Sequence, residues 1–322
     1  MQALESNKNA PVRKKSISKV VKHTMKEFRK QLSLQIMILI GLAFIIFFRF
    51  VPIYGLQLAF KELMPGKGIW DSPWVGFKHF QDFFLSGHFK TVMGNTISLS
   101  LMKLFIAFPV PILFAILLNE ISSYRFRSIV QGITYLPHFI SYVIVYGVVS
   151  SILNRDGGSL NSLLLSLGII KEPIHFLASK PLFWPLMVLL DIWKETGWNS
   201  IIYMAAIAGI NPELYEAARV DGANKIRQII SITLPSLVPV MIVLLILRVG
   251  SILDAGFEQL LVFRNPIVFE KANILDVYVM DIGIEQGRFG YATAVGLFKS
   301  VISFIMIYFS NKIANRSEYG LW

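Results

Sequence analysis

Six ionisable side chains stand inside long apolar stretches of this sequence, where a charge is costly. They are Lys103, Asp191, Lys194, Glu195, Arg248 and Lys299. An ionisable group in such a stretch usually faces a water-filled cavity or an opposite charge. The set can therefore bind a charged solute, or it can hold helices together by ion pairs, and the sequence leaves both interpretations open. The spacing of Asp191 to Lys194 and Glu195 permits a local pair.

Aromatic and amide side chains accompany these charges in one stretch, and they suggest the kind of solute. Aromatic faces next to amide donors suit sugar rings, whereas the alternative is that the tryptophans pack between helices. Four cationic against two acidic side chains in the apolar stretches favour an acidic solute, such as a uronate-containing oligosaccharide. The candidate solute path comprises Trp193, Lys194, Glu195, Trp198, Asn199 and Arg248.

Catalytic and metal-binding patterns are missing from the sequence. There is no G-x4-G-K-[ST] phosphate loop, no H-E-x-x-H metal motif and no G-x-S-x-G nucleophile motif. The absence of cysteine excludes disulfides and thiolate metal sites. The five histidines are scattered, and His138 is interpreted as a hydrogen-bonded helix residue. We therefore expect no enzyme activity, no catalytic residue, and no metal or other cofactor bound by this chain.

The composition indicates an integral membrane protein. Hydrophobic residues make up 54% of the 322 residues and charged residues 16%, against about 25% charged in soluble domains. Of the net charge of +11, nine Lys and Arg residues fall between Lys8 and Lys30, next to the first apolar stretch. Cytoplasmic segments beside a membrane gather such charge, so we expect a lipid surface as partner and no nucleic acid. The first apolar stretch is too long for a cleaved signal peptide.

Six apolar stretches are long enough to cross a bilayer, which takes about 20 residues. They span roughly 34–58, 95–119, 128–152, 183–208, 236–256 and 290–311. The prediction is an all-α integral membrane protein with a basic cytoplasmic segment 1–33 and a six-span domain 34–322. Both termini are expected in the cytoplasm, as are the connections 120–127 and 209–235. Pro109, Pro111 and Pro137 predict kinks, either around a cavity or from packing.

The connection 211–235 reads as two short helices. Asn211 is a good N-cap and Pro212 suits the first helical position. Gly222 stands where a helix ends and the chain turns left-handed. A second helix is expected from Ala223, with Pro235 ending it before the next span. These two helices, residues 211–235, are called the finger. If the finger packs against the spans, it can transmit a mechanical displacement to them.

The same connection carries the pattern E-A-A-x3-G-x9-I-x-L-P over residues 216–235. This pattern resembles the EAA loop of the membrane subunits of ATP-binding-cassette (ABC) importers with the MetI-like type I fold. The resemblance implies that the loop docks into an ATPase subunit and receives its mechanical stroke. The alternative is an ordinary amphipathic connection between spans. The implied coupling residues are Glu216, Ala217, Ala218, Arg219, Asp221 and Gly222.

Further segments extend the resemblance over residues 34–322. They are 51–55, 59–61, 72–77, 135–141, 255–259, 291–296 and 318–322. They are similar to permeases for complex oligosaccharides, such as alginate or rhamnogalacturonan fragments, that depend on a solute-binding protein. The resemblance implies a cell-membrane importer with a second, different permease subunit, two ATPase subunits that bind ATP and Mg²⁺, and an extracytoplasmic binding protein. The alternatives are an importer of another solute, such as an amino acid or phosphonate, or a channel or secondary transporter.

Overall fold

The computed structural model describes residues 31–64, 66–316 and 320. The expected basic segment 1–33 lies outside the described residues except for 31–33, and the tail motif 318–322 lies outside them except for Gly320. Over the described ranges the chain is helical and has no strand beyond one isolated bridge between Lys61 and Trp74. The predicted all-α class is confirmed.

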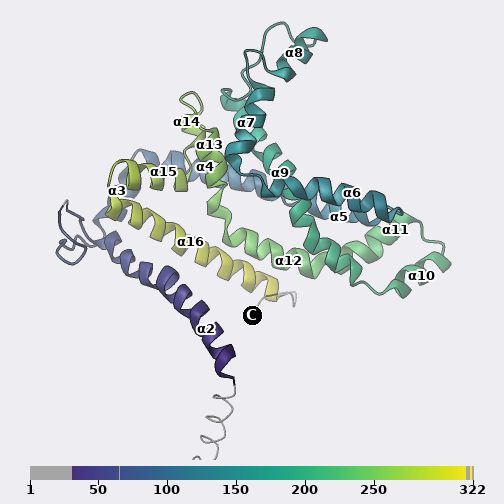
Figure 1. Cartoon of the computed structure of the whole chain (residues 1–322), viewed down its shortest axis with the longest axis horizontal. Helices are drawn as coiled ribbons and strands as arrows, with labels where there is room; N and C mark the ends of the chain where they lie inside the picture. Colours follow the sequence, from purple (N-terminus) through teal and green to yellow (C-terminus); the bar gives the residue numbers. More distant parts are fainter. Residues whose placement is uncertain (1–30, 65, 317–319, 321–322) are drawn as a thin grey trace, which may run out of the picture. The chain divides into compact units, whose positions relative to one another are not determined.

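The chain divides into two compact units, residues 1–57 and 58–322. In the first unit, α2 (Leu32–Ile45, purple in Figure 1) continues through the π-helical turn η1 (Ile46–Phe50) into the 3-10 helix η2 (Val51–Phe60), which crosses the boundary between the two units. No residue of α2 is buried, although its side chains are nearly all apolar. A helix that is apolar all round needs an apolar environment, which for a membrane protein is lipid or another subunit.

The second unit consists of helices that are mostly joined by short connections, with longer ones at 61–77 and 167–179 (Figure 1). Its elements are α3 (Lys78–Leu85), α4 (His88–Met102), η3 (Lys103–Ala107), α5 (Pro109–Asn119), α6 (Tyr124–Tyr135), η4 (Leu136–Phe139), α7 (Tyr142–Leu153), α8 (Ser159–Ser166), α9 (Lys180–Ala208), α10 (Pro212–Val220), α11 (Lys225–Gln228), η5 (Ile229–Thr233), α12 (Leu234–Gly250), η6 (Ile252–Asp254), α13 (Phe257–Phe263), α14 (Phe269–Ala272), α15 (Leu275–Met280), η7 (Asp281–Glu285) and α16 (Phe289–Asn315).

Among the described residues, four helical runs are long and apolar enough to cross a membrane, and a bent pair raises the number to five. The four runs are Leu32–Phe60, His88–Asn119, Lys225–Gly250 and Phe289–Asn315. The stretch predicted at 183–208 is one continuous helix, α9, of 29 residues. Helix α9 is not one of the four apolar runs because the charged residues Asp191, Lys194 and Glu195 interrupt it. The number of six spans therefore stays a prediction.

The bent pair lies where one span was predicted at 128–152. The run Tyr124–Phe139 and α7 meet at an angle of 105°. Ile140 and Ser141 are extended between them, and the Ser141 hydroxyl caps α7 by accepting from the Ile144 N–H at 3.5 Å. The kink expected at Pro137 is therefore a complete break, because two extended residues separate the helices.

Prolines inside the other runs follow π-helical turns. Pro109 comes directly after η3 and Phe108, and Pro235 comes directly after η5 and Leu234. In each case the residue before the proline donates to the carbonyl five residues back. The wider turn relieves the clash of the proline ring with the preceding turn. The prediction that Pro235 ends the helix is wrong, since the run continues to Gly250.

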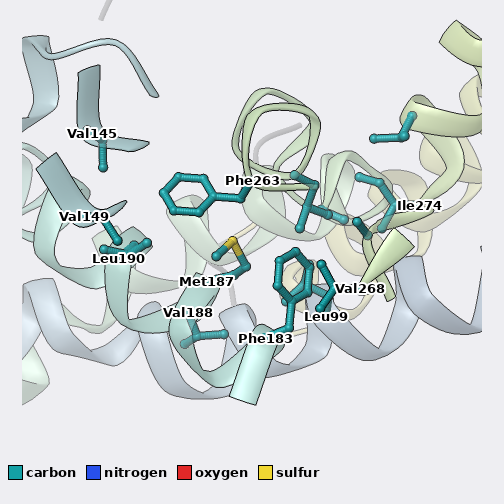
Figure 2. Close-up of a cluster of buried hydrophobic side chains, with 14 of the residues drawn as sticks. Leu99, Val145, Val149, Phe183, Met187, Val188, Leu190, Phe263, Val268 and Ile274 are labelled. Atoms are coloured by element: carbon teal, nitrogen blue, oxygen red, sulfur yellow. The ribbon is translucent and has the colours of Figure 1, made fainter. Parts of the chain in front are cut away.

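The largest hydrophobic core surrounds the N-terminal half of α9 (Figure 2). Phe183 and Met187 are fully buried there, and Leu99 of α4 and Phe263 of α13 pack in the same cluster. A second cluster joins the C-terminal half of α9 to α5 and α12. Because both clusters include α9, this helix sets the positions of the helices around it.

The connection between α12 and α16 is held by charge pairs. Arg264 donates to both carboxylate oxygens of Asp281 at 2.7 and 2.9 Å and to Glu285 at 3.3 Å. These hydrogen bonds raise the pKa of Arg264 above its usual value. Partly buried Asp276 has a raised pKa because desolvation outweighs its pairing with Lys299. The segment is therefore ordered by ionic contacts as well as by its helices.

Helices α6 and α9 approach closely at Gly197. A Cβ built on Gly197 would overlap the backbone carbonyl oxygen of Thr134 in α6. Small residues allow such close contacts between membrane helices, where packing rather than the hydrophobic effect drives association. Gly132, on α6, has no neighbouring atom within 4 Å of the same position.

We predict that Gly197→Ala destabilises the protein by about 1–3 kcal/mol, because the added methyl must push α6 away from α9. Gly132→Ala is the matched control and should be neutral or mildly stabilising, since alanine favours a helix. Thermal unfolding of the two purified variants measures the difference. Equal melting temperatures would show that the α6–α9 contact can widen without cost.

Candidate functional site

Two adjoining cavities lie beside the middle of α9. The first has a volume of about 240 Å³ and opens between α5, α9 and α12. The second has a volume of about 180 Å³ and lies between η3, α9 and the connection that follows α12. Asp191, Arg248 and Ser251 line both cavities. The candidate site is therefore one polar region in two parts.

Residues spaced by four place three polar groups of α9 on the side facing the first cavity. Asp191, Glu195 and Asn199 all line it, as the helical period requires. Of the predicted path residues, Glu195, Asn199 and Arg248 reach this cavity. Trp193, Lys194 and Trp198 are not in its lining.

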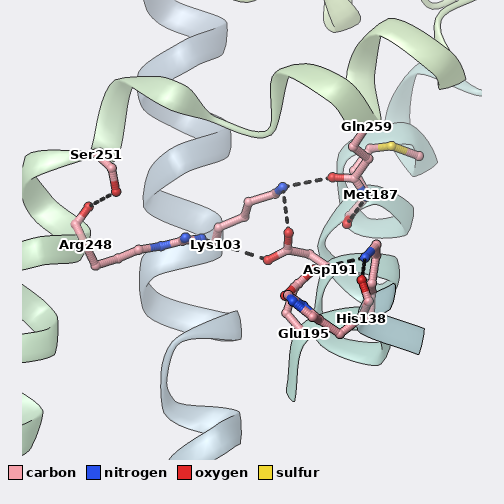
Figure 3. A network of polar contacts seen from close by, with 9 residues as sticks. Lys103, His138, Met187, Asp191, Glu195, Arg248, Ser251 and Gln259 are labelled. Carbon is pink, nitrogen blue, oxygen red and sulfur yellow. Dashed lines mark hydrogen bonds and ion pairs between the residues drawn. The ribbon is translucent and has the colours of Figure 1, made fainter. Parts of the chain in front are cut away.

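Lys103 forms the centre of a buried polar network (Figure 3). Its ammonium donates to Asp191 Oδ1 at 3.0 Å and to Gln259 Oε1 at 2.8 Å, and its side chain is 3% exposed. Gln259 in turn donates to the Met187 carbonyl at 2.8 Å. These contacts join η3, α9 and α13, so one ammonium fixes three elements.

The chain is shaped around this ammonium. Gly256 has a φ of +95°, a conformation that favours glycine, and a Cβ there would lie 2.5 Å from the Lys103 Nζ. The preceding residue, Ala255, also has a positive φ of 47°. This turn lets the connection after α12 pass directly over the lysine.

Arg248 contacts the same aspartate more loosely. It lies in the last turn of α12, its side chain is 46% exposed, and its Nη2 is 3.9 Å from Asp191 Oδ2. A contact at that distance is an ion pair without a well-formed hydrogen bond. The guanidinium therefore keeps most of its donors for a ligand or water.

Lys194 and Glu195 form a pair with each other, whereas the pair between Asp191 and Lys194 allowed by their spacing is not formed. Lys194 is 3.4 Å from Glu195 Oε1 and donates to the His138 carbonyl at 2.5 Å. Asp191 is directed toward Lys103 instead. The partner of Asp191 is 88 residues away in the sequence, so local spacing gives no signal for it.

His138 links the broken span to α9. Its Nδ1 lies 2.7 Å from Glu195 Oε2, and because a carboxylate only accepts, Nδ1 carries the proton of this bond. Its ring stacks on Trp198 with centroids 4.5 Å apart and planes at 1°. The interpretation of His138 as a hydrogen-bonded residue is confirmed. One face of Trp198 is thus occupied, and Trp193 is half-exposed away from the cavity lining.

The connection between α9 and α12 forms the expected pair of short helices. Asn211 Oδ1 accepts from the Glu213 N–H at 3.0 Å, and Gly222 has a φ of +77°. The second helix begins at Lys225 rather than at Ala223, because Asn224 caps it by accepting from the Arg227 N–H at 2.9 Å. The N-cap at Asn224 was missed, although asparagine is a strong capping residue.

The candidate coupling residues lie on the surface of this finger. Glu216, Ala217, Arg219, Asp221 and Gly222 are exposed and Ala218 is half-buried. The apolar residue between them, Val220, is 88% exposed. The Tyr215 hydroxyl meets the Thr233 hydroxyl at 2.9 Å, which ties α10 to the following helical run.

Comparison with known proteins decides the family. The family described as "Binding-protein-dependent transport system inner membrane component" matches residues 94–318. The chain belongs to this family. Its members are membrane components of ABC importers, and such components are not themselves enzymes.

Individual members of this importer family resemble the chain over nearly its whole length. The polygalacturonan/rhamnogalacturonan transport system permease protein YteP of Bacillus subtilis (strain 168) is 43% identical over 294 residues, which are 91% of each chain. The arabinooligosaccharides transport system permease protein AraP of the same organism is 28% identical, over 85% of each chain. A crystal structure of a bacterial ABC transporter involved in the import of the acidic polysaccharide alginate contains a chain with 38% identity and a TM-score of 0.83, covering 91% of this chain and 99% of that one. The predicted MetI-like permease fold is confirmed.

We predict that Gly256→Ala abolishes transport, because its Cβ would lie 2.5 Å from the Lys103 Nζ and displace the ammonium from its acceptors. Gly168→Ala is a matched control, since Gly168 also has a positive φ, +67°, but no atom within 4 Å of an added Cβ. Uptake by the complete importer should be lost with the first variant and largely kept with the second. Equal loss in both would assign the effect to backbone strain alone.

Proposed function

We propose that this chain forms half of the translocation path of an ABC importer for acidic oligosaccharides derived from a polysaccharide. The observation that carries the proposal is a polar cavity with a half-exposed arginine in a chain 43% identical to a polygalacturonan/rhamnogalacturonan permease. A solved neighbour comes from the import of an acidic polysaccharide, which supports the same solute class.

Arg248 is the proposed receptor for a solute carboxylate, because a guanidinium binds a carboxylate with two parallel hydrogen bonds. Asn199 and Glu195 line the same cavity and can bind sugar hydroxyls. Lys194 holds Glu195 by an ion pair and the His138 carbonyl by a hydrogen bond, and Trp198 stacks on the His138 ring. Trp193, half-exposed outside the lining, is proposed to face the second permease subunit.

The size of the cavity supports a second subunit. Its volume of about 240 Å³ is below the roughly 300–1,000 Å³ of typical ligand pockets, and an oligosaccharide has several rings. A second, different permease is proposed to supply the other wall. An extracytoplasmic solute-binding protein is proposed to deliver the solute, supported by a neighbour that was solved in complex with an alginate pentasaccharide-bound periplasmic protein.

Energy is proposed to enter through the finger between α9 and α12. The exposed residues Glu216, Ala217, Arg219, Asp221 and Gly222, with Ala218, would contact an ATPase subunit that holds ATP and Mg²⁺. The finger and both termini are proposed to lie on the cytoplasmic side of the cell membrane, and the basic N-terminal segment supports this orientation. Closure of two ATPase subunits would push α10, and the spans would alternate between outward and inward access.

We predict that the complete importer in proteoliposomes takes up oligo-uronates in preference to neutral oligosaccharides of equal length. Arg248→Gln should raise the KM for the oligo-uronate roughly tenfold to hundredfold, because a hydrogen bond to a charged group contributes about 1.5–3 kcal/mol. ATP hydrolysis without solute should stay near the wild-type rate. Equal uptake of acidic and neutral solutes by the wild type would overturn the proposed solute class.

We also predict that Ala217→Trp uncouples ATP hydrolysis from transport, since a large side chain cannot enter a cleft shaped for alanine. Glu213→Gln, on the same helix but outside the motif, is the control. The measurements are co-purification of the ATPase subunits and solute-stimulated ATP hydrolysis. Normal stimulation in Ala217→Trp would contradict the proposed coupling role of this finger.

A further inference from the structure

Every carboxylate that lines the two cavities has a lysine as its partner. Asp191 lines both cavities, Glu195 lines the first and Asp254 lines the second, and each lies within ion-pair distance of an ammonium. The pairs are Asp191 with Lys103 at 3.0 Å, Glu195 with Lys194 at 3.4 Å and Asp254 with Lys299 at 2.6 Å.

These lysines are largely buried, and Lys103 also forms part of the wall of the second cavity. The side chains of Lys103, Lys194 and Lys299 are 3%, 7% and 17% exposed. Lys299 is shared with a second carboxylate, Asp276, at 2.7 Å. A close pair of opposite charges has a weak field a few ångströms away, because the two contributions largely cancel. Three of the four cationic side chains counted in the apolar stretches are therefore already paired with carboxylates.

Arg248 is the exception. It lines both cavities, and within the described part of the chain its nearest carboxylate oxygen, Asp191 Oδ2, is 3.9 Å away. The other oxygen of Asp191 accepts from Lys103 at 3.0 Å. The aspartate is therefore held by the buried lysine and only approached by the half-exposed arginine (Figure 3).

We infer that Lys103 is a specificity-determining residue that acts without touching the solute. It neutralises Asp191, and Arg248 thereby keeps a positive charge available for a solute carboxylate. Without the lysine, Asp191 would have Arg248 as its nearest cation, the two would close into a tight pair, and the cavity would lose its preference for anions. This inference rests on the proposed function, because it concerns the charge of the solute.

The surroundings of Lys103 support a fixed charge rather than a mobile side chain. Gln259 holds the ammonium at 2.8 Å, and the left-handed turn at Gly256 closes over it. A long lysine side chain near a cavity would otherwise extend toward water. The carboxamide of Gln259 carries no charge, so it anchors the ammonium while leaving the ionic balance to Asp191.

The test removes the charges of Lys103 and Asp191 singly and together. Lys103→Met leaves Asp191 without its lysine, the double variant Lys103→Met with Asp191→Asn removes both charges, and Asp191→Asn leaves Lys103 and Arg248 unopposed. The measured quantity is kcat/KM for an oligo-uronate divided by kcat/KM for its methyl ester, with the complete importer in proteoliposomes. The ratio should fall on the order of tenfold in Lys103→Met, return to about wild type in the double variant and rise above it in Asp191→Asn.

A purely structural role predicts another pattern. Loss of packing would lower uptake of the acid and the ester together, so an unchanged ratio in Lys103→Met and Asp191→Asn would overturn the inference. Asp191→Asn preserves shape and the bond from Lys103 to Gln259, which keeps the test valid if Lys103→Met fails to assemble. A wild-type importer without preference for the acid would instead overturn the proposed function. Lys180→Met, at an exposed lysine paired with Glu270 outside both cavities, controls for loss of positive charge in general.

Discussion

A buried ammonium needs acceptors from the protein in place of the water it has lost, and this constraint organises the centre of the second unit. Lys103 is 3% exposed and receives an acceptor from α9 and another from α13. Removing a charge from water costs several kcal/mol, so each of these acceptors must be in place whenever the helices are packed. The left-handed turn at Gly256 and the hydrophobic cluster around Phe183 lie where these elements meet.

The distribution of polar groups along α9 separates two tasks. The N-terminal half carries Phe183 and Met187 into the largest core, whereas Asp191, Glu195 and Asn199 face the cavity. A helix with this composition cannot be stable alone in lipid, since its charges need partners. It is stable here because η3 and η4 supply Lys103 and His138 as partners, while α5, α6 and α12 pack around it.

Local features of the fold were predictable from sequence, and long-range pairings were not. Asn211 and Gly222 were assigned correctly because a cap and a left-handed turn depend on a few adjacent residues. The partner of Asp191 was not, because Lys103 is 88 positions away and several lysines were equally eligible. Pro235 was taken for a helix end, since the π-helical turn that accommodates it leaves no mark in composition.

The uninterrupted run from Lys225 to Gly250 has a mechanical consequence. At about 1.5 Å per residue, its 26 residues form a rod of roughly 39 Å with the Asn224 cap at one end and Arg248 near the other. The bond from Tyr215 to Thr233 clamps α10 to that rod. In the proposed mechanism, displacement of the finger would reach Arg248 along this run, which can bend at the wide turn before Pro235 and at Pro239. In the proposed mechanism, binding of the solute anion by Arg248 and movement of the finger would therefore change together.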